Sequence, residues 1–154
     1  QRRAGIDLQG RNGQKLSDKW AGGPRTFHGI HVNGFPNCFV LGGVQSTLAF
    51  NVPHHLNEQA VTIAQLLGHS KKAGFKAVEA TQEAEHAWVD AIINDGHRIS
   101  LPGQDPCTPG YYNNEGQSMK NGRYFRAFKG GPPNYFKKLK EWRETGDFDG
   151  IDFS

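Results

Sequence analysis

The sequence predicts an α/β fold, and two neighbouring apolar runs with a glycine-rich loop after them are the main observations. FHGIHV (residues 27–32) alternates like a half-buried strand, and CFVL (residues 38–41) is continuous like a strand covered on both faces. Between them, NGFPN is typical of a turn, because Asn-Gly tolerates positive φ and proline fixes its own φ. Gly42 and Gly43 follow. A buried strand that ends in a glycine-rich loop is where open α/β sheets bind ligands.

Helical periodicity marks three later segments. The first two cover residues 54–67 and 78–94, and Asp95-Gly96 predicts the end of the second. The third opens at Pro132-Pro133 and closes at Gly146. Upstream, a short alternating piece precedes a hairpin-type turn at Arg11-Asn12-Gly13, and residues 99–131 read as an irregular loop. The apolar positions on the three helices are Ala60, Ile63, Ala64, Leu67, then Ala80, Ala84, Ala87, Trp88, Ala91, Ile92, and then Tyr135, Phe136, Leu139, Trp142.

Composition limits the function classes. At 154 residues and a net charge of +3, the chain is one mildly basic domain. The lysine clusters at 71–76 and 137–140 fall in or beside predicted helices, which favours solvated faces over a nucleic-acid surface. Two cysteines, Cys38 and Cys107, make no disulfide framework, so we expect a reducing, cytoplasmic location. No apolar run has the ~20 residues of a membrane span.

No complete active site is visible in the sequence. His28 and His31 would lie on opposite faces of a strand, and His54 and His55 fall at a helix start, so we expect no metal site. Cys38 reads as a small buried hydrophobe, whereas Cys107 lies between two prolines. Gly-x-Ser-x-Gly, Gly-x-Gly-x-x-Gly and Walker motifs do not occur. The sequence therefore assigns no catalytic residue and no metal ligand.

Two aromatic segments leave alternatives open. CTPGYYNNEG (residues 107–116) carries paired tyrosines that suit either stacking on a flat ligand ring or ordinary packing. QSTLAFNVPHH (residues 45–55) could line a ligand edge with small polar groups and an apolar wall, or could simply connect a strand to a helix.

Four motifs, in chain order, carry a resemblance to one family. GxxLxxxWxxGPRTFxG covers residues 13–29, and GFPNCFVLGG covers residues 34–43. NVPHHLNEQAVTIAQLL follows at 51–67, and GGPPNYFKKLKEWRETGDFDGIDF ends the series at 130–153. Together they resemble the C-terminal part of the type I Baeyer–Villiger flavoprotein monooxygenases. The loop at 107–116 resembles the subgroup that acts on bulky cyclic or steroid-like ketones.

The resemblance implies a whole protein that holds FAD and NADPH and traps O2 as a flavin peroxide. That protein would insert one oxygen atom next to a ketone carbonyl to give an ester or lactone. Residues 1–98 would be the C-terminal part of a Rossmann-like FAD-binding domain, with its last sheet strands and following helices. Residues 99–154 would be a loop-rich extension packing on it. The implied partners are a ketone, O2 and the N-terminal FAD and NADP domains of the same protein.

The resemblance also implies roles for individual residues. Part of the chain would pass the isoalloxazine ring, part would face the substrate, and two tyrosines would lie in the loop that closes over the coenzyme. The cofactor-binding residues would be Gly42, Gly43, Gln45, Ser46, Thr47, Leu48, Tyr111 and Tyr112, and the substrate-side residues Leu48, Phe50 and Val52.

The chain also departs from the family pattern. The family's two Gly-x-Gly-x-x-Gly motifs are missing, and Phe27-His28-Gly29 starts its Phe-x-Gly fingerprint but has Asn33 at the histidine position. No segment resembles the one that carries the catalytic arginine. We therefore expect this chain to be inactive alone. The alternatives are a fragment of an N- or S-oxygenating flavoprotein and a non-enzymatic α/β binding module.

Overall fold

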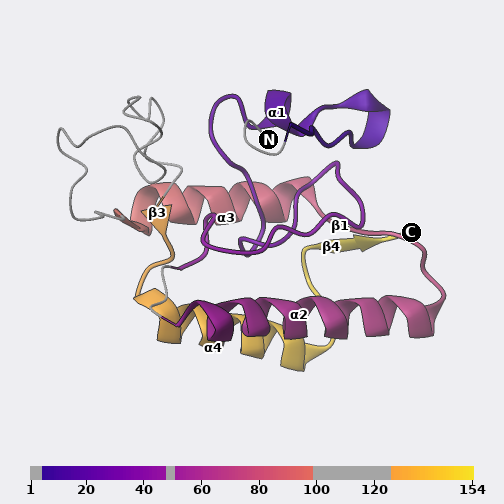
Figure 1. Ribbon diagram of the computed structural model, residues 1–154. Coiled ribbons are helices and arrows are strands. Elements are labelled where there is room, and N and C mark those ends of the chain that lie inside the picture. Colours follow the sequence, from indigo (N-terminus) through magenta and orange to yellow (C-terminus); the bar gives the residue numbers. More distant parts are fainter. Residues whose placement is uncertain (1–4, 48–50, 99–125) are drawn as a thin grey trace.

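The computed structural model describes residues 5–47, 51–98 and 126–154. Helices and short strands follow one another along the chain, which confirms a mixed helix and strand fold (Figure 1). In chain order the elements are η1 (Arg11–Gly13), α1 (Leu16–Lys19), α2 (Val52–Ala73), β1 (Val78–Ala80), α3 (Gln82–Asp95), β2 (His97–Arg98), β3 (Arg126–Ala127), α4 (Gly131–Thr145) and β4 (Ile151–Phe153).

Two small antiparallel sheets join distant parts of the chain. β1 pairs with β4 so that Val78 faces Phe153 and Ala80 faces Ile151. β2 pairs with β3. The first pairing fastens the C-terminal strand to the segment between α2 and α3, and α4 packs along α2 (Figure 1). Residues 126–154 therefore complete the same core as the residues before position 98.

The hydrophobic core lies where α2, α3, α4 and the β1–β4 sheet meet. It is rich in aromatic rings, with Trp88 stacked on Phe128 at a centroid distance of 5.0 Å. Its buried apolar members are Phe27, Ile30, Leu66, Val78, Ala80, Trp88, Ile92, Tyr135, Leu139, Phe148 and Ile151. A smaller cluster of Leu16, Val32 and Phe35 anchors the N-terminal segment.

The two predicted strands at 27–32 and 38–41 are wrong as continuous strands. Phe27 and His31 exchange backbone hydrogen bonds of 2.8 and 3.0 Å across a tight turn. His28 and Gly29 take positive φ values of 56° and 70° there, which reverses the chain in the middle of the expected strand. What remains is a bridge between His31 and Phe39. The predicted turn between the runs is confirmed, with Gly34 and Asn37 at positive φ.

The predicted helix over 78–94 begins too early. Val78–Ala80 is strand β1, and α3 starts at Gln82 with Thr81 as its N-cap, whose side chain accepts from the Ala84 amide. The partner strand β4 lies more than 70 residues away in sequence. Local periodicity therefore could not indicate that these three residues pair as a strand. The predicted end at Asp95-Gly96 is confirmed.

Helices α2 and α4 are confirmed, but α2 turns a different face inward from its apolar one. α4 buries Tyr135 and Leu139 and ends at Gly146, with Phe136 and Trp142 partly buried as predicted. The buried side of α2 consists of His55, Gln59, Thr62, Leu66 and Ser70. Of its predicted apolar positions, Ala60, Ala64 and Leu67 face outward, whereas Ile63 is partly buried against the core. The helix exposes them because its polar side chains bond the loop that precedes it.

Candidate functional site

The glycine-rich loop at residues 42–47 is irregular in conformation and has a buried end. Gln45, Ser46 and Thr47 are each at most 2% exposed. Gly42 has a φ of 115°, which L side chains rarely adopt, and a Cβ added there would meet no atom within 4 Å. The loop therefore has a buried polar base and an open approach on its glycine side.

Helix α2 holds the loop through the Gly42 anchor, which we define as the side chains of Ser46, His55 and Gln59 on the Gly42 backbone. Gln59 accepts from the Gly42 amide at 2.8 Å and donates to the Gly42 carbonyl at 3.1 Å. Ser46 Oγ donates to the same carbonyl at 2.7 Å, and His55 Nε2 lies 3.0 Å from it. Since a carbonyl only accepts, His55 carries its proton on Nε2.

Helix α4 extends the anchor to the turn at His28. Gln59 donates to the Tyr135 hydroxyl at 3.2 Å, and that hydroxyl donates to the His28 carbonyl at 2.8 Å. The Tyr135 ring also stacks on His55 at 5.7 Å. Burial raises the pKa of the Tyr135 phenol, although its hydrogen bond from Gln59 acts in the opposite direction. The phenol is therefore protonated at neutral pH and donates this hydrogen bond.

The other end of the loop is fixed from three sides. The Gln45 side chain accepts from both the backbone amide and the hydroxyl of Thr26, and it donates to the Pro24 carbonyl at 2.8 Å. The Trp88 indole of α3 donates to the Gln45 carbonyl at 2.9 Å. The Phe128 amide donates to the Ser46 carbonyl at 2.6 Å. Residues as far apart in the sequence as Pro24 and Tyr135 therefore lie around the six-residue loop 42–47.

Two polar atoms beside this loop have no hydrogen-bond partner among the described residues. They are Thr47 Oγ1 and His55 Nδ1, both buried. The Nδ1 atom is the ring nitrogen of His55 that does not face the Gly42 carbonyl. An unsatisfied buried polar group costs about 1–3 kcal/mol, so such atoms indicate a missing partner. The loop's spare groups are a hydroxyl and an imidazole nitrogen, both of which can hydrogen-bond a ligand.

The structure brings together only part of the set of residues that the sequence assigns to binding. Gly42, Gly43, Gln45, Ser46 and Thr47 share the loop. Val52 starts α2 and is 56% exposed. Leu48, Phe50, Tyr111 and Tyr112 lie outside the described residues, and their roles stay predictions.

Sequence reasoning missed the residues that shape the loop. His55, Gln59, Trp88 and Tyr135 all bond its backbone or one another. One signal was present: His55, Gln59 and Thr62 repeat at helical spacing, so α2 carries a polar stripe beside its apolar one.

The buried histidine pair differs from its expected placement. His28 and His31 do not point to opposite faces of a strand, because both rings contact Trp142, at 4.9 and 6.1 Å. Burial lowers the pKa of His28 well below its ordinary value and that of His31 to about 3, so both are neutral. Within the described ranges, no group of three metal-ligating side chains occurs. Burial raises the pKa of the Cys38 thiol.

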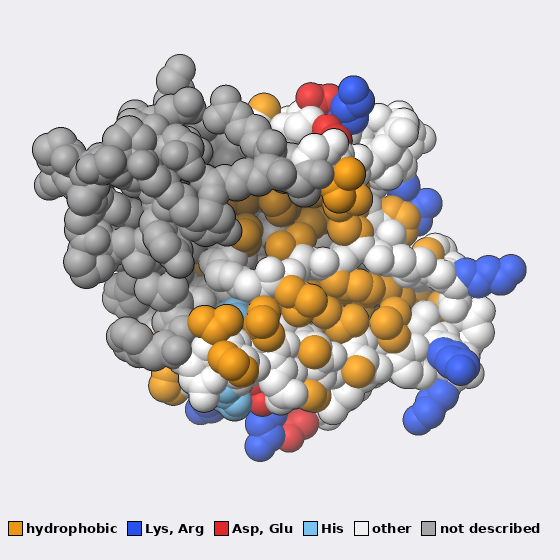
Figure 2. Space-filling model, viewed as in Figure 1, with side chains coloured by type: hydrophobic (Ala, Val, Ile, Leu, Met, Phe, Trp, Pro, Cys, Tyr) orange, Lys and Arg blue, Asp and Glu red, His pale blue; other side chains and the backbone are white. Residues whose placement is uncertain are grey.

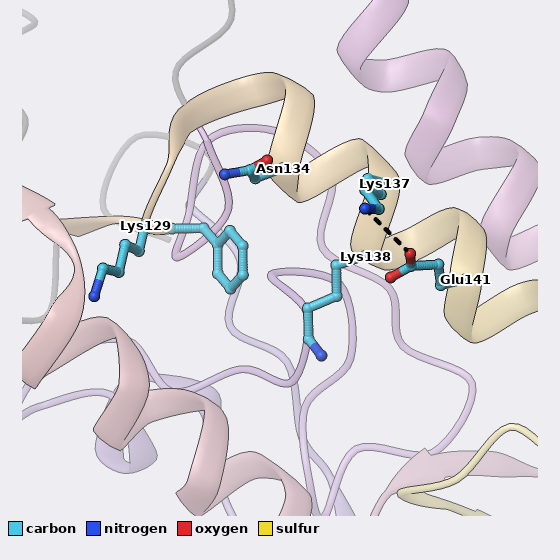
Figure 3. Close-up of a pocket in the computed structure, with 6 residues that line it drawn as sticks. Lys129, Asn134, Lys137, Lys138 and Glu141 are labelled. Carbon is cyan, nitrogen blue, oxygen red and sulfur yellow. Dashed lines mark ion pairs between the residues drawn. The ribbon is translucent and has the colours of Figure 1, made fainter.

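An open pocket of about 430 Å³ lies against α4 (Figure 3). Phe128, Lys129, Asn134, Lys137, Lys138 and Glu141 line it. Its polar lining residues are all exposed, and Lys137 pairs with Glu141 at 3.7 Å. The pocket is a solvent-exposed hollow beside the lysine cluster at 137–140, and the sequence predicts a solvated face there. The 42–47 loop differs from the pocket, because it combines burial with unpaired polar atoms.

Comparison with known proteins gives a consistent set of relatives. No protein-family profile matches the chain. It is 43% identical over 145 residues to neopentalenolactone D synthase of Streptomyces avermitilis, covering 94% of this chain and 24% of that protein. A Baeyer–Villiger monooxygenase of Streptomyces coelicolor is 41% identical, with 90% of this chain and 23% of that protein covered. An FAD-binding monooxygenase of Hypomyces subiculosus is 35% identical, with 97% and 25% covered.

Solved structures agree with the sequence comparison. The polycyclic ketone monooxygenase of Thermothelomyces thermophila matches with a TM-score of 0.80 and 34% identity, over 99% of this chain and 24% of that one. An oxidized steroid monooxygenase bound to NADP matches with a TM-score of 0.73 and 29% identity, over 96% and 26%. The chain thus spans about a quarter of the length of the relatives it matches. In the described part of the chain, no helix is long and apolar enough to cross a membrane.

Proposed function

We propose that this chain, a relative of the C-terminal portion of the Baeyer–Villiger monooxygenases in sequence and in fold, is part of a flavin-dependent monooxygenase. The enzyme would use NADPH and O2 to insert one oxygen atom next to a ketone carbonyl, giving an ester or lactone. The observation that carries the proposal is the 42–47 loop, whose residues 45–47 are buried, which is held by α2, α3, residues 24–26 and Phe128, and which has polar atoms without a partner among the described residues.

The role of this chain would be to present the loop to FAD. Bound FAD would supply the redox chemistry that activates O2. The Gly42 anchor would hold the loop rigid, so that ordering the loop costs no further entropy when the cofactor binds. Thr47 Oγ1 and His55 Nδ1 would satisfy polar groups on the flavin ring, with His55 accepting a hydrogen bond.

The substrate and coenzyme sides of the site follow from the resemblance. Leu48, Phe50 and Val52 would form the apolar wall that the ketone contacts, and Tyr111 and Tyr112 would lie over NADPH. The exposure of Val52 at the start of α2 is consistent with a surface that contacts another group. Relatives named for polycyclic ketones and steroids favour a bulky cyclic ketone as the substrate class.

The alternatives from the sequence are less well supported. An N- or S-oxygenating flavoprotein and a non-enzymatic α/β module would each be compatible with mixed helix and strand. Neither is favoured, because the relatives include proteins named as Baeyer–Villiger and polycyclic ketone monooxygenases.

The test uses the product of the complete reading frame that contains these 154 residues. We expect bound FAD, NADPH oxidation stimulated by a polycyclic ketone, and a product heavier by one oxygen atom. Thr47→Val should shift the flavin absorption spectrum, because it removes the free hydroxyl at constant volume. Thr145→Val, on the exposed end of α4, is the control and should leave the spectrum unchanged. Absence of flavin, or NADPH oxidation without oxygenated product, would refute the proposal.

A further inference from the structure

Glu85 of α3 is a buried carboxylate with partners from the N-terminal part of the chain. Acidic side chains are visible at the upper and lower edges of the face in Figure 2, whereas Glu85 is only 1% exposed. One of its carboxylate oxygens lies 2.9 Å from Lys19 Nζ and 3.5 Å from Arg25 Nε, and the other accepts from the Asn33 amide at 2.9 Å. A buried ion pair often adds little net stability, and its clearer effect is to fix the position of its partners.

The Arg25 side chain connects Glu85 to the residues that hold Gln45. Pro24, on one side of Arg25, accepts from the Gln45 side chain through its carbonyl at 2.8 Å. Thr26, on the other side, donates to the Gln45 side chain from its amide at 2.9 Å and from its hydroxyl at 2.8 Å. A displacement of Arg25 would therefore disturb all three of these hydrogen bonds.

Helix α3 also reaches Gln45 directly. The Trp88 indole, three residues after Glu85, donates to the Gln45 carbonyl at 2.9 Å. α3 therefore holds the Gln45 backbone through one side chain, and the Gln45 side chain through the Glu85–Arg25 pair. The φ of Gln45 is 50°, in the left-handed region that residues other than glycine rarely adopt. Such a conformation persists only where several contacts enforce it.

We propose that Glu85 is a positioning residue for the 42–47 loop. Its carboxylate fixes Arg25, and the residues on either side of Arg25 keep Gln45 in the left-handed conformation. The orientation of that backbone sets the direction of the loop residues that follow. This inference rests on the proposed function, in which the loop contacts FAD, and it adds a residue that acts on the loop from outside it.

Glu79 of β1 is a matched comparison within the same structure. It is also a buried carboxylate, it pairs with Arg11, and it accepts from the Gly34 amide at 2.9 Å. The Gly34 amide directly follows the Asn33 amide that Glu85 binds, so both carboxylates hold the same turn. The cation of the Glu79 pair comes from η1, whereas Glu85 pairs with a cation inside the segment that holds the loop. We therefore expect only the Glu85 pair to act on the loop.

The first experiment separates the two cations of Glu85 in the product of the complete reading frame. Arg25→Met removes the cation beside the loop contacts and Lys19→Met removes the other, so Glu85 keeps one cation in each variant. Hydrogen exchange at the Thr26 amide, measured relative to the slowest amides of α3, should accelerate about tenfold in Arg25→Met, because the bond to Gln45 opens locally. Lys19→Met should leave this ratio unchanged. Equal acceleration in the two variants, or none in Arg25→Met, would overturn the proposal.

The second experiment removes the charge of Glu85 itself. Glu85→Gln and Glu79→Gln each keep the side-chain volume and an acceptor for the turn amide, and each loses an ion pair. Only Glu85→Gln should accelerate relative exchange at the Thr26 amide. It should also raise the apparent Kd for FAD by a similar factor, because the loop then holds its binding conformation for a smaller fraction of the time. Equal effects of the two glutamine variants would overturn the proposal.

Conservative replacement and the unmodified protein complete the test. Arg25→Lys keeps a cation beside Glu85 and should recover most of what Arg25→Met loses. If Glu85→Gln does not fold, the comparison of Arg25→Met with Lys19→Met decides alone. Exchange at Thr26 that depends on Arg25 in a protein that binds no FAD would refute the proposed function and leave the positioning role standing. Tightly bound FAD with the same exchange in every variant would refute only the positioning role.

Discussion

Helices α2 and α4 are alike in construction and opposite in what they expose. Each has proline in its first turn and a left-handed glycine after its last, Gly74 and Gly146. α4 buries apolar side chains and exposes Lys–Glu pairs, as a helix between core and water does. α2 buries four polar side chains beside Leu66, and it exposes Leu56, Leu67 and two alanines. The difference shows that the face a helix turns inward depends on the hydrogen bonds its side chains make there as well as on its apolar residues.

The largest expected effect is on the inner face of α4. Tyr135→Ala should lower the free energy of unfolding by about 3–5 kcal/mol, because it removes a fully buried ring. Tyr135→Phe keeps the ring but removes one of the partners of Gln59 Nε2 and the bond to the His28 carbonyl, and should cost about 1–3 kcal/mol. Chemical denaturation measures both. Equal losses for the two variants would show that the hydroxyl alone stabilises the helix.

Acid should weaken the packing beneath α4. His28 and His31 lie against Trp142, and burial lowers the pKa of both, that of His31 from 6.5 to about 3. His31 and Lys138 also oppose protonation of His28. As the pH falls, both histidines take up a proton near pH 6.5 in the unfolded chain, but only at a lower pH in the folded chain. The contribution of the two neutral histidines to the free energy of unfolding is therefore complete above pH 6.5 and declines as the pH falls. For His31 the decline levels off near pH 3.

The slope should approach about 1.4 kcal/mol per pH unit for each histidine. Denaturation midpoints between pH 7 and pH 4 measure it. His31→Gln should flatten the profile, whereas His86→Gln, at an exposed position of α3, should not. An unchanged slope in His31→Gln would contradict the assignment.

On the inner face of α2, Gln59→Leu should cost about 1–3 kcal/mol, because the Gly42 amide and carbonyl lose a buried partner. Hydrogen exchange at the Gly42 amide should accelerate in the same variant. Gln65→Leu, the same change on the exposed side of α2, is the matched control and should leave both measurements unchanged. Similar effects at 59 and 65 would mean that the anchor does not hold the loop.

The smallest effect belongs to the outer face of α4. Glu144→Gln removes the exposed pair with Lys140, whose atoms lie 3.7 Å apart, and should cost about 0.2–0.5 kcal/mol. The difference should vanish in 1 M salt, where screening extends over only about 3 Å. A larger loss of stability that does not change with salt would mean that the outer face of α4 is not exposed to solvent, and the contrast with α2 would fail.

The sequence predicted local structure well where one segment contains all the information. The end of α3 at Asp95-Gly96 and the closing glycine of α4 depend on nearby residues, and both are confirmed. The strand Val78–Ala80 depends on a partner at Ile151–Phe153, and the turn at His28 interrupts a run that alternates like a strand. Periodicity could not indicate either feature.

For the site, composition located the 42–47 loop but not what holds it. Its glycines and small polar residues are local features of the sequence. Gln59 and Trp88 bond the loop over 17 and 43 residues, and Tyr135 bonds Gln59 over 76, so nothing near them in sequence identifies these partners. The inward polar face of α2 follows from these bonds, which is why the apolar stripe alone suggested the wrong orientation.

The bond from Tyr135 to the His28 carbonyl also has a consequence for biosynthesis. It joins residues 107 positions apart, and Tyr135 bonds Gln59 across 76. A ribosome that has translated α2 has not yet made Tyr135, whose hydroxyl links Gln59 of the Gly42 anchor to the His28 carbonyl. The 42–47 loop can therefore reach its final shape only after α4 has emerged, so the nascent chain must first be translated almost to its C-terminal strand.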